Sequence, residues 1–361
     1  MISSLRLSNF KCFSDVNFEL SSINVLAGSN ACGKSSVIHA LLIARQSWEK
    51  SEKIKKVYLC GKYINLGKIN DVINEFSDKG EELSIDIINE SGQSVSIKPI
   101  EDNTSYVLDN SSTNDEITLN LFNESFEYLS AERIVPSSSY SMITDNNSLG
   151  IHGEYTMHFL ANKGLELIVE DALCANDSTQ KYLLYQTNAW LKEVFDGIEL
   201  RTKSFDELDS VSLRYQETNN RYGSMLHRSI NVGFGITYTL PIIVALLKSR
   251  KDDLLIIENP EAHLHPKAQT MIGYLITKAA ANGAQIILET HSDHVLNGIR
   301  VSVKEGLISP KQTKIFFFAR ENVGSHYKVN VFAPNINKRG GLDFWPEGFL
   351  DEWDKALTKL F

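Results

Sequence analysis

The chain has 361 residues, 42% of them hydrophobic and 22% charged, as expected of a globular protein with a substantial core. With 36 Lys and Arg against 45 Asp and Glu, its formal charge of −9 argues against a surface that is basic all over, although it does not exclude a local basic groove. The four cysteines are widely spaced, and we find neither a signal pattern nor a bilayer-spanning apolar run. We therefore expect reduced thiols in a cytoplasmic protein without a membrane partner.

The N-terminal segment predicts short strands, because apolar and polar residues alternate between turn residues. These strands are expected at residues 4–7 continuing into 10–13, then at 16–20 and at 23–27. The last of them is a short, mostly apolar run that leads directly into a glycine-containing loop.

That loop matches the pattern G-x-x-x-x-G-K-[ST] at every fixed position, and a dense apolar stretch at residues 36–48 predicts a buried helix after it. The loop and the first residue after it are Gly28, Ser29, Asn30, Ala31, Cys32, Gly33, Lys34, Ser35 and Ser36. Glycines let backbone N–H groups surround a phosphate, and the helix N-terminus adds partial positive charge. We expect Lys34 to reach the β- and γ-phosphates and the Ser35 hydroxyl to bind Mg²⁺. Asn30 either touches a terminal phosphate or forms the turn. The sequence thus predicts a nucleoside triphosphate site.

The middle of the chain changes from strand-like to helical periodicity. Residues from about 57 to 128 alternate as in an antiparallel sheet, with a hairpin turn at residues 90–93, and another strand is expected at 126–134. Residues 154–195 predict two helices in a hairpin, and 210–216 a further strand. There is no internal repeat and no sustained heptad, so we do not expect a long coiled coil.

Two later apolar runs predict strands covered on both faces, at residues 254–258 and 285–289. The first ends in Glu258, at the place where P-loop proteins keep an acid that holds Mg²⁺, usually through water. The alternative is an acidic turn residue after a buried strand. Because the loop at residues 28–35 needs a magnesium partner, we favour the metal role for Glu258.

Three stretches around these strands, at residues 231–235, 259–266 and 285–292, carry a resemblance to a known family. With the glycine loop they resemble ABC-type ATPase heads of the chromosome-maintenance (SMC), RecF and overcoming-lysogenization-defect branch. Within it, the sequence is similar to stand-alone bacterial ATPases of predicted anti-phage defence operons. Residues 66–71, 128–133 and 345–349 agree, and the resemblance is weakest at about 160–220.

The resemblance implies an α/β fold, a two-lobe P-loop ATPase head in which one lobe carries a mixed sheet and the other parallel strands and helices. We expect lobe I at residues 1–150 and a short helical insertion in place of a coiled-coil arm at 151–225. Lobe II would follow at 226–361, with a C-terminal tail.

In such ATPases two heads face each other, and a signature stretch of one caps the ATP held by the other. The matching residues here are Gly233, Phe234 and Gly235, before a helix expected at 236–248. Gly233 stands where the family usually has a serine, so one hydroxyl donor is lost. The alternative is a plain glycine loop before an apolar helix.

The family places a glutamate after the magnesium acid to polarise the attacking water, but this chain has Asn259 there. An amide can orient water yet cannot take its proton. Glu261 is the nearest carboxylate that can substitute, unless it is a solvated or helix-capping acid. His291 matches the family's switch histidine, which contacts the γ-phosphate or the water; the alternative is an ordinary loop histidine.

His263 and His265 match the family's dimer-contact loop. A zinc site is the alternative, but no Cys or acid spacing completes a known ligand set.

Three functions follow from the motifs. The first is a nucleotide-switched ATPase using ATP and Mg²⁺ that forms a homodimer and gates a separate nuclease or toxin effector, in phage defence. The second is a RecF-like ATPase that binds nucleic acid, which the acidic balance and missing coiled coil disfavour. The third is a module that binds ATP but barely hydrolyses it, because Asn259 replaces the base.

Overall fold

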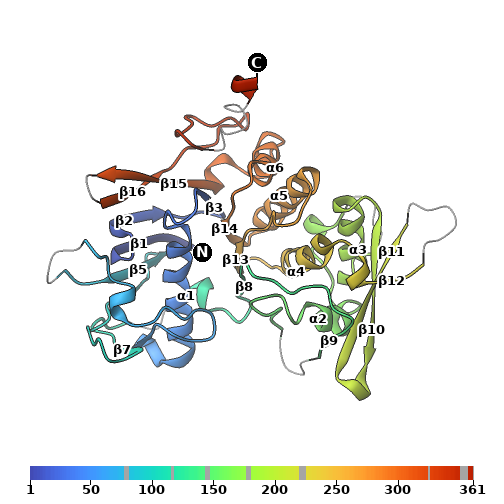
Figure 1. Cartoon of the computed structure of the whole chain (residues 1–361), viewed down its shortest axis with the longest axis horizontal. Helices are drawn as coiled ribbons and strands as arrows, with labels where there is room; N and C mark the ends of the chain where they lie inside the picture. Colours follow the sequence, from blue (N-terminus) through green and yellow to red (C-terminus); the bar gives the residue numbers. More distant parts are fainter. Residues whose placement is uncertain are drawn as a thin grey trace. The chain divides into compact units, whose positions relative to one another are not determined.

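The computed structural model describes residues 1–76, 81–114, 118–142, 147–175, 180–218, 225–323, 326–349 and 357–360. The chain divides into two compact units (Figure 1). Unit 1 comprises Met1–Glu124, Lys311–Asn335 and Leu342–Phe361, and unit 2 comprises Ser125–Pro310 and Ile336–Gly341. The chain therefore leaves unit 1 at Glu124 and returns to it at Lys311. The lobe boundaries expected near residues 150 and 225 stay a prediction.

Unit 1 contains an antiparallel sheet in the order β2-β1-β5-β6. Its strands are β1 (Ile2–Phe10), β2 (Phe13–Glu19), β5 (Ser84–Asn89) and β6 (Ser94–Ile97). The hairpin turn predicted at residues 90–93 joins β5 to β6, as expected, and Gly92 adopts a positive φ of 81° there. A small antiparallel pair, β4 (Lys56–Tyr58) and β7 (Val107–Asp109), completes this part.

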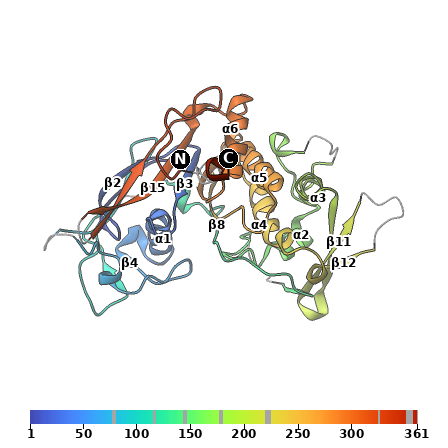
Figure 2. The ribbon, with the colours of Figure 1, turned by 45° about the horizontal axis from the view of Figure 1, so that its top comes forward.

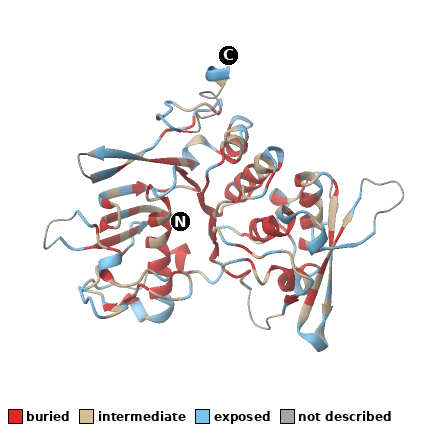
Figure 3. Cartoon of the chain, viewed as in Figure 1, coloured by how far each residue is buried: buried red, intermediate tan, exposed pale blue. Residues whose placement is uncertain are grey.

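The strand before the glycine loop is β3 (Ile23–Gly28), which pairs in parallel with β15 (Thr313–Val323). β15 also pairs antiparallel with β16 (His326–Phe332). Helix α1 (Lys34–Lys50) follows the loop and buries twelve of its residues, so its apolar sequence is explained by packing on several sides (Figure 3).

Unit 2 contains a parallel sheet in which β13 (Leu254–Glu258) lies between β14 (Gln285–Glu289) and β8 (Glu127–Leu129). β13 and β14 have the bounds that the sequence predicted, and both are buried (Figure 3). β8 is shorter than the strand expected at 126–134, because the chain leaves the sheet after Leu129. The α/β class is thus confirmed.

Three helices accompany this sheet: α4 (Phe234–Lys248), α5 (Pro266–Ala281) and α6 (Asp293–Lys304). Gly273 and Gly298 allow α5 and α6 to approach closely, since a Cβ at either position would lie 2.3 Å from a backbone oxygen of the other helix. None of the described helices is long and apolar enough to cross a membrane.

The remainder of unit 2 combines two helices with an antiparallel sheet (Figure 2). The helices are α2 (Thr156–Lys163) and α3 (Leu183–Val194), in the region where a helical hairpin was predicted. The sheet contains β10 (Ile198–Phe205), β11 (Ser210–Glu217), β12 (His227–Arg228) and β9 (Tyr140–Ser141). The insertion is therefore short and contains no coiled-coil arm among its described residues, but it is not purely helical.

Candidate nucleotide site

The glycine loop of unit 1 joins the end of β3 to the first turn of α1. Gly28 has φ 141°, Ala31 φ 57° and Gly33 φ 95°, so the chain enters the left-handed region three times in six residues. A Cβ on Gly28 would lie 2.3 Å from the carbonyl oxygen of Phe318 in β15, and one on Gly33 would lie 2.5 Å from Cys12 Sγ. Both glycines are therefore required by backbone conformation and by space.

Lys34 points its ammonium group back over this loop. Its Nζ donates hydrogen bonds to the carbonyl oxygens of Gly28, at 3.1 Å, and Ser29, at 2.8 Å, and the residue is 3% exposed. Under the loop, Cys32 is buried with its Sγ 2.8 Å from Ser29 Oγ. The fixed ammonium group of Lys34, the positive φ angles of the glycines and the N-terminus of the 17-residue helix α1 together suit the binding of a phosphate group.

The side chain of Lys11 lies close to that of His39, a residue of α1. Lys11 Nζ is 2.7 Å from His39 Nδ1, so the ammonium donates to a neutral imidazole. Burial, followed by the charge of Lys11, lowers the pKa of His39 to about 4. Burial also lowers the pKa of Lys11. His39 is therefore neutral at physiological pH.

The acid of unit 2, Glu258, stands at the carboxyl end of β13. Its Oε1 accepts a hydrogen bond from Tyr128 Oη at 3.0 Å, and its Oε2 accepts one from the Ala131 N–H at 3.0 Å. β8 supplies Tyr128 and the segment just after it supplies Ala131, because β8 runs parallel to β13 with Leu129 opposite Ile257. Burial raises the pKa of Glu258, while these two hydrogen bonds and the charge of Arg133 oppose that rise.

Arg133 is a buried cation at the same edge, 4% exposed. Its guanidinium donates to the backbone carbonyls of Glu258 and, at 3.3 Å, of Asn259, and lies 4.8 Å from the ring centroid of Tyr238. Burial lowers the pKa of Arg133 to about 10, so the group is still charged at neutral pH. Its Nε is buried without a hydrogen-bond partner among the described residues. Arg133 thus places a positive charge next to the backbone of Glu258 and Asn259.

The three catalytic candidates lie on adjoining segments of unit 2. Asn259 has φ 43° and donates its N–H to the Glu289 carbonyl at 2.8 Å. Glu261 accepts from Thr290 Oγ1 and from the His291 N–H, each at 2.7 Å. Glu261 therefore joins the turn after β13 to the turn after β14.

The signature stretch meets the histidine segment in the same unit. Gly233 is the N-cap of α4, which begins at Phe234, two residues earlier than predicted. A Cβ on Gly235 would lie 2.4 Å from the His263 carbonyl oxygen, so a glycine is needed there. The His263 ring packs 4.7 Å from Phe234 and 5.0 Å from Tyr238, measured between centroids. The residues of the signature stretch therefore have a structural role in packing against His263, in addition to their candidate role in binding nucleotide.

The histidines do not form a metal site in the described part of the chain. His265 is the N-cap residue of α5, before Pro266 at its first position. No three His, Cys, Asp or Glu side chains among the described residues are placed to hold one ion. The geometry gives the zinc alternative no support, and the pairing of Ser35 with Glu258 on one Mg²⁺ stays a prediction.

Tyr128, Ala131, Arg133 and Thr290 were not assigned a role from the sequence. The available signal was a strand ending at Leu129 and followed by polar residues, since carboxyl ends of parallel strands meet at one edge of a sheet. Using it would have required knowing that β8 neighbours β13, which is 125 residues further along the chain.

Comparisons with known proteins agree with this geometry. Residues 1–193, more than half of the chain, match a family described as AAA ATPase domain. The chain belongs to this family. ATP binding and ATPase chemistry are therefore its general function, and the resemblance to ABC-type ATPase heads is confirmed at this level.

Two further families match parts of this AAA ATPase. Residues 183–297 match a family described as AAA domain, putative AbiEii toxin, Type IV TA system. Residues 308–360 match a family described as protein of unknown function (DUF3696). No curated protein matches the chain significantly.

Three solved structures are similar to this chain. The SMC head domain from Thermotoga maritima is 13% identical with a TM-score of 0.40, over 91% of this chain and 98% of that one. An SMC head bound to the C-winged helix domain of ScpA is 12% identical with a TM-score of 0.45, over 92% and 98%. An SMC head with an extended coiled coil, bound to the C-terminal domain of ScpA derived from Pyrococcus furiosus, is 11% identical with a TM-score of 0.44, over 99% of each chain. At these values the likeness makes no statement about function.

Proposed function

We propose that this AAA ATPase hydrolyses ATP at the glycine loop, dimerises when ATP binds and thereby gates a separate effector protein. The observation that carries the proposal is the loop at residues 28–35, where three left-handed residues and the Lys34 ammonium precede the N-terminus of α1. Backbone N–H groups and Lys34 would bind the β- and γ-phosphates.

Ser35 and Glu258 would hold magnesium, which neutralises phosphate charge and orients the triphosphate when it is bound. Each oxygen of Glu258 already accepts one hydrogen bond, from Tyr128 or from Ala131. Because a carboxylate oxygen has further acceptor capacity, Glu258 can also accept from a metal-bound water.

Glu261 would take the proton of the attacking water, since the amide of Asn259 can only orient that water. The support is that Glu261 is fixed by Thr290 and by the His291 backbone, so the base and the switch histidine would respond together to the γ-phosphate. The charge of Arg133 lowers the pKa of Glu258 against the effect of burial, which helps to keep that carboxylate ionised.

The signature Gly233, Phe234 and Gly235 of one copy would cap the nucleotide of a second copy. Gly233 is exposed at the N-terminus of α4, where nothing lies within 4 Å of its Cβ position, so a phosphate can approach the helix amides. The proposed place of this ATPase in a defence system, beside a toxin or nuclease effector, is supported only by the second matched family, whose description names a putative toxin and a toxin–antitoxin (TA) system.

Asn259 favours a second candidate, a module that binds ATP and hydrolyses it very slowly. Both oxygens of Glu261 already accept hydrogen bonds, so the attacking water would have to share an acceptor that is already occupied, which is consistent with a slow reaction.

Phosphate release and light scattering test the proposal together. Wild type should release phosphate and form dimers with ATP, Lys34→Ala should do neither, and Glu261→Gln should dimerise with phosphate release lowered about 100-fold. Dimers without phosphate release in the wild type would favour the slow module, and a monomer under every nucleotide condition would overturn ATP-linked dimerisation.

A further inference from the structure

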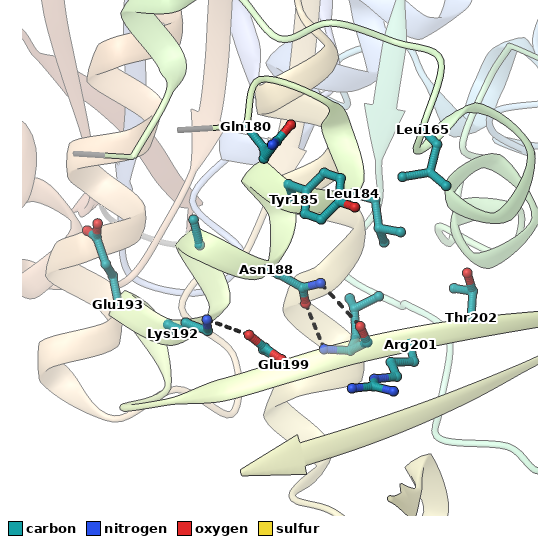
Figure 4. A pocket seen from close by; sticks show the side chains of 12 residues that line it. Leu165, Gln180, Leu184, Tyr185, Asn188, Lys192, Glu193, Glu199, Arg201 and Thr202 are labelled. Atoms are coloured by element: carbon teal, nitrogen blue, oxygen red, sulfur yellow. Dashed lines mark hydrogen bonds and ion pairs between the residues drawn. The ribbon is translucent and has the colours of Figure 1, made fainter. Parts of the chain in front are cut away.

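A groove opens in unit 2 between α3 and the edge of β10, with a volume of about 840 Å³ (Figure 4). Leu165, Leu184, Tyr185 and Leu200 give it an apolar wall. Leu165 is 58% exposed and Tyr185 46% exposed, although both are large hydrophobic side chains. The proposed nucleotide reaction uses none of these residues.

β10, beside this groove, is an edge strand, and the outward backbone groups of its first part already have hydrogen-bond partners. Asn188 Oδ1 accepts the Leu200 N–H at 2.7 Å, and its Nδ2 donates to the Leu200 carbonyl at 3.2 Å (Figure 4). The Leu200 backbone therefore points away from β11. Because these directions alternate along a strand, the backbone groups of Thr202 and Ser204 point outward too.

The pairing of β11 confirms this alternation. Val211 and Tyr215, which lie opposite Ser204 and Leu200, pair outward with Tyr140 of β9 and His227 of β12. On the β10 side, the described residues offer no comparable neighbour, and Thr202 and Ser204 make no backbone hydrogen bond there. The edge of β10 beyond Asn188 is therefore available to another strand.

The exposed face of the same sheet is basic. Arg201 lies opposite Arg214, which lies opposite Arg228, and Lys203 is the next residue of β10 on this face. Like charges directly opposite each other disfavour pairing. Within the described ranges none of the three arginines forms an ion pair, in a chain whose formal charge is −9. This face is therefore suited to an anionic partner.

We propose that an extended, acidic segment of a partner protein adds to the edge of β10 as a further strand. Its main chain pairs with Thr202 and Ser204. Its alternate side chains are apolar toward Tyr185 and Leu165, and acidic beside Arg201 and Lys203. A groove with one apolar wall and outward backbone groups of the neighbouring strand favour a peptide over a nucleic acid, which would use the basic face alone.

Fluorescence anisotropy with labelled peptides tests this docking surface on the full chain without nucleotide. The probe is an acetylated E-V-E-F-E-V-E peptide, and its matched control is K-V-K-F-K-V-K. The acidic peptide should bind, and the lysine peptide should bind at least about tenfold more weakly because Arg201 and Lys203 repel it. Failure of the acidic peptide to bind, or equal binding of both, would overturn the proposal.

Two variants separate the contribution of backbone pairing to peptide binding from the contribution of charge. Thr202→Pro removes only an outward N–H, which edge strands tolerate, and Arg201→Glu reverses one charge. Each should weaken binding of the acidic peptide about tenfold or more, while the exposed-site control Lys338→Glu stays within about twofold. Circular dichroism checks that the fold is kept; if Thr202→Pro does not fold, Tyr185→Ala replaces it with the same expected loss.

Unchanged peptide binding by these variants would overturn the proposal. So would a single-stranded oligonucleotide that binds in place of the peptide and loses affinity in Arg201→Glu. Lys34→Ala should bind the peptide like the wild type, so this test can fail or succeed independently of the ATPase reaction.

Discussion

At the scale of single residues, the glycine loop depends on close backbone approach as much as on conformation. Gly28 and Gly92 both have positive φ angles, of 141° and 81°, but their surroundings differ. A Cβ on Gly28 would meet the Phe318 backbone at 2.3 Å, whereas nothing lies within 4 Å of a Cβ on Gly92.

Gly28→Ala should therefore lower the free energy of unfolding by about 2–4 kcal/mol, because β15 must move away from β3. Gly92→Ala, the matched control in the same unit, should lower it by only about 1 kcal/mol of conformational strain. Urea denaturation measures both values. Equal losses for the two variants would show that contact with Phe318 is not what restricts Gly28.

His39 makes stability depend on pH because burial and, after it, the charge of Lys11 lower its pKa. Its pKa is about 4 in the folded chain and 6.5 ordinarily, so between these values the unfolded chain binds a proton that the folded chain does not. Stability should therefore rise from pH 4 to pH 6.5, by about 3 kcal/mol from this group. His39→Gln keeps an acceptor for Lys11 and should remove that part of the slope in denaturation at several pH values; an unchanged slope would contradict the assignment.

At the scale of elements, β8 and the residues after it form a clamp on the end of β13. Tyr128 and Ala131 donate to the two carboxylate oxygens of Glu258, and Arg133 donates to the backbone carbonyl of the same residue. Burial alone would keep this acid protonated to a higher pH. The clamp thus helps the carboxylate to ionise, which metal binding requires.

Tyr128→Phe removes one donor to the ionised form of Glu258 and should raise the pKa of that acid. The acidic limb of the pH profile of kcat/KM for ATP hydrolysis should then move to higher pH, with a loss of about 3–10-fold on that limb and recovery above it. Tyr182→Phe, in a tyrosine with no assigned contact to the site, should leave the profile unchanged. A uniform loss at every pH would show a structural effect instead.

Elements buried on all sides were predictable from sequence. β13 and β14 were predicted with their observed bounds, since a strand covered on both faces carries consecutive apolar residues instead of an alternating pattern. β10 was missed because its polar and charged residues fit an exposed face and an open edge, where burial imposes little pattern. The clamp by Tyr128 and Arg133 was missed because it joins residues about 125–130 positions apart, which no local period encodes.

At the scale of the whole molecule, the chain builds its glycine loop and its catalytic candidates in different units. The loop with Lys34 and Ser35 belongs to unit 1, and Glu258, Glu261 and His291 belong to unit 2. The loop and Glu258 were predicted from a motif and its flanking strands, whereas Glu261 and His291 were predicted from the resemblance to ABC-type ATPase heads. It did not indicate that the chain returns to unit 1 at Lys311, because β15 carries an apolar run without a motif.

Calorimetric titration of ATP and Mg²⁺ into the purified chain tests most directly whether the glycine loop binds a triphosphate. Wild type and Lys50→Ala, a lysine at the far end of the same helix, should bind with equal affinity. Lys34→Ala should bind about 100-fold more weakly, a difference of roughly 2.7 kcal/mol. Equal affinity of Lys34→Ala and the wild type, or no binding by the wild type at millimolar ATP, would contradict the account.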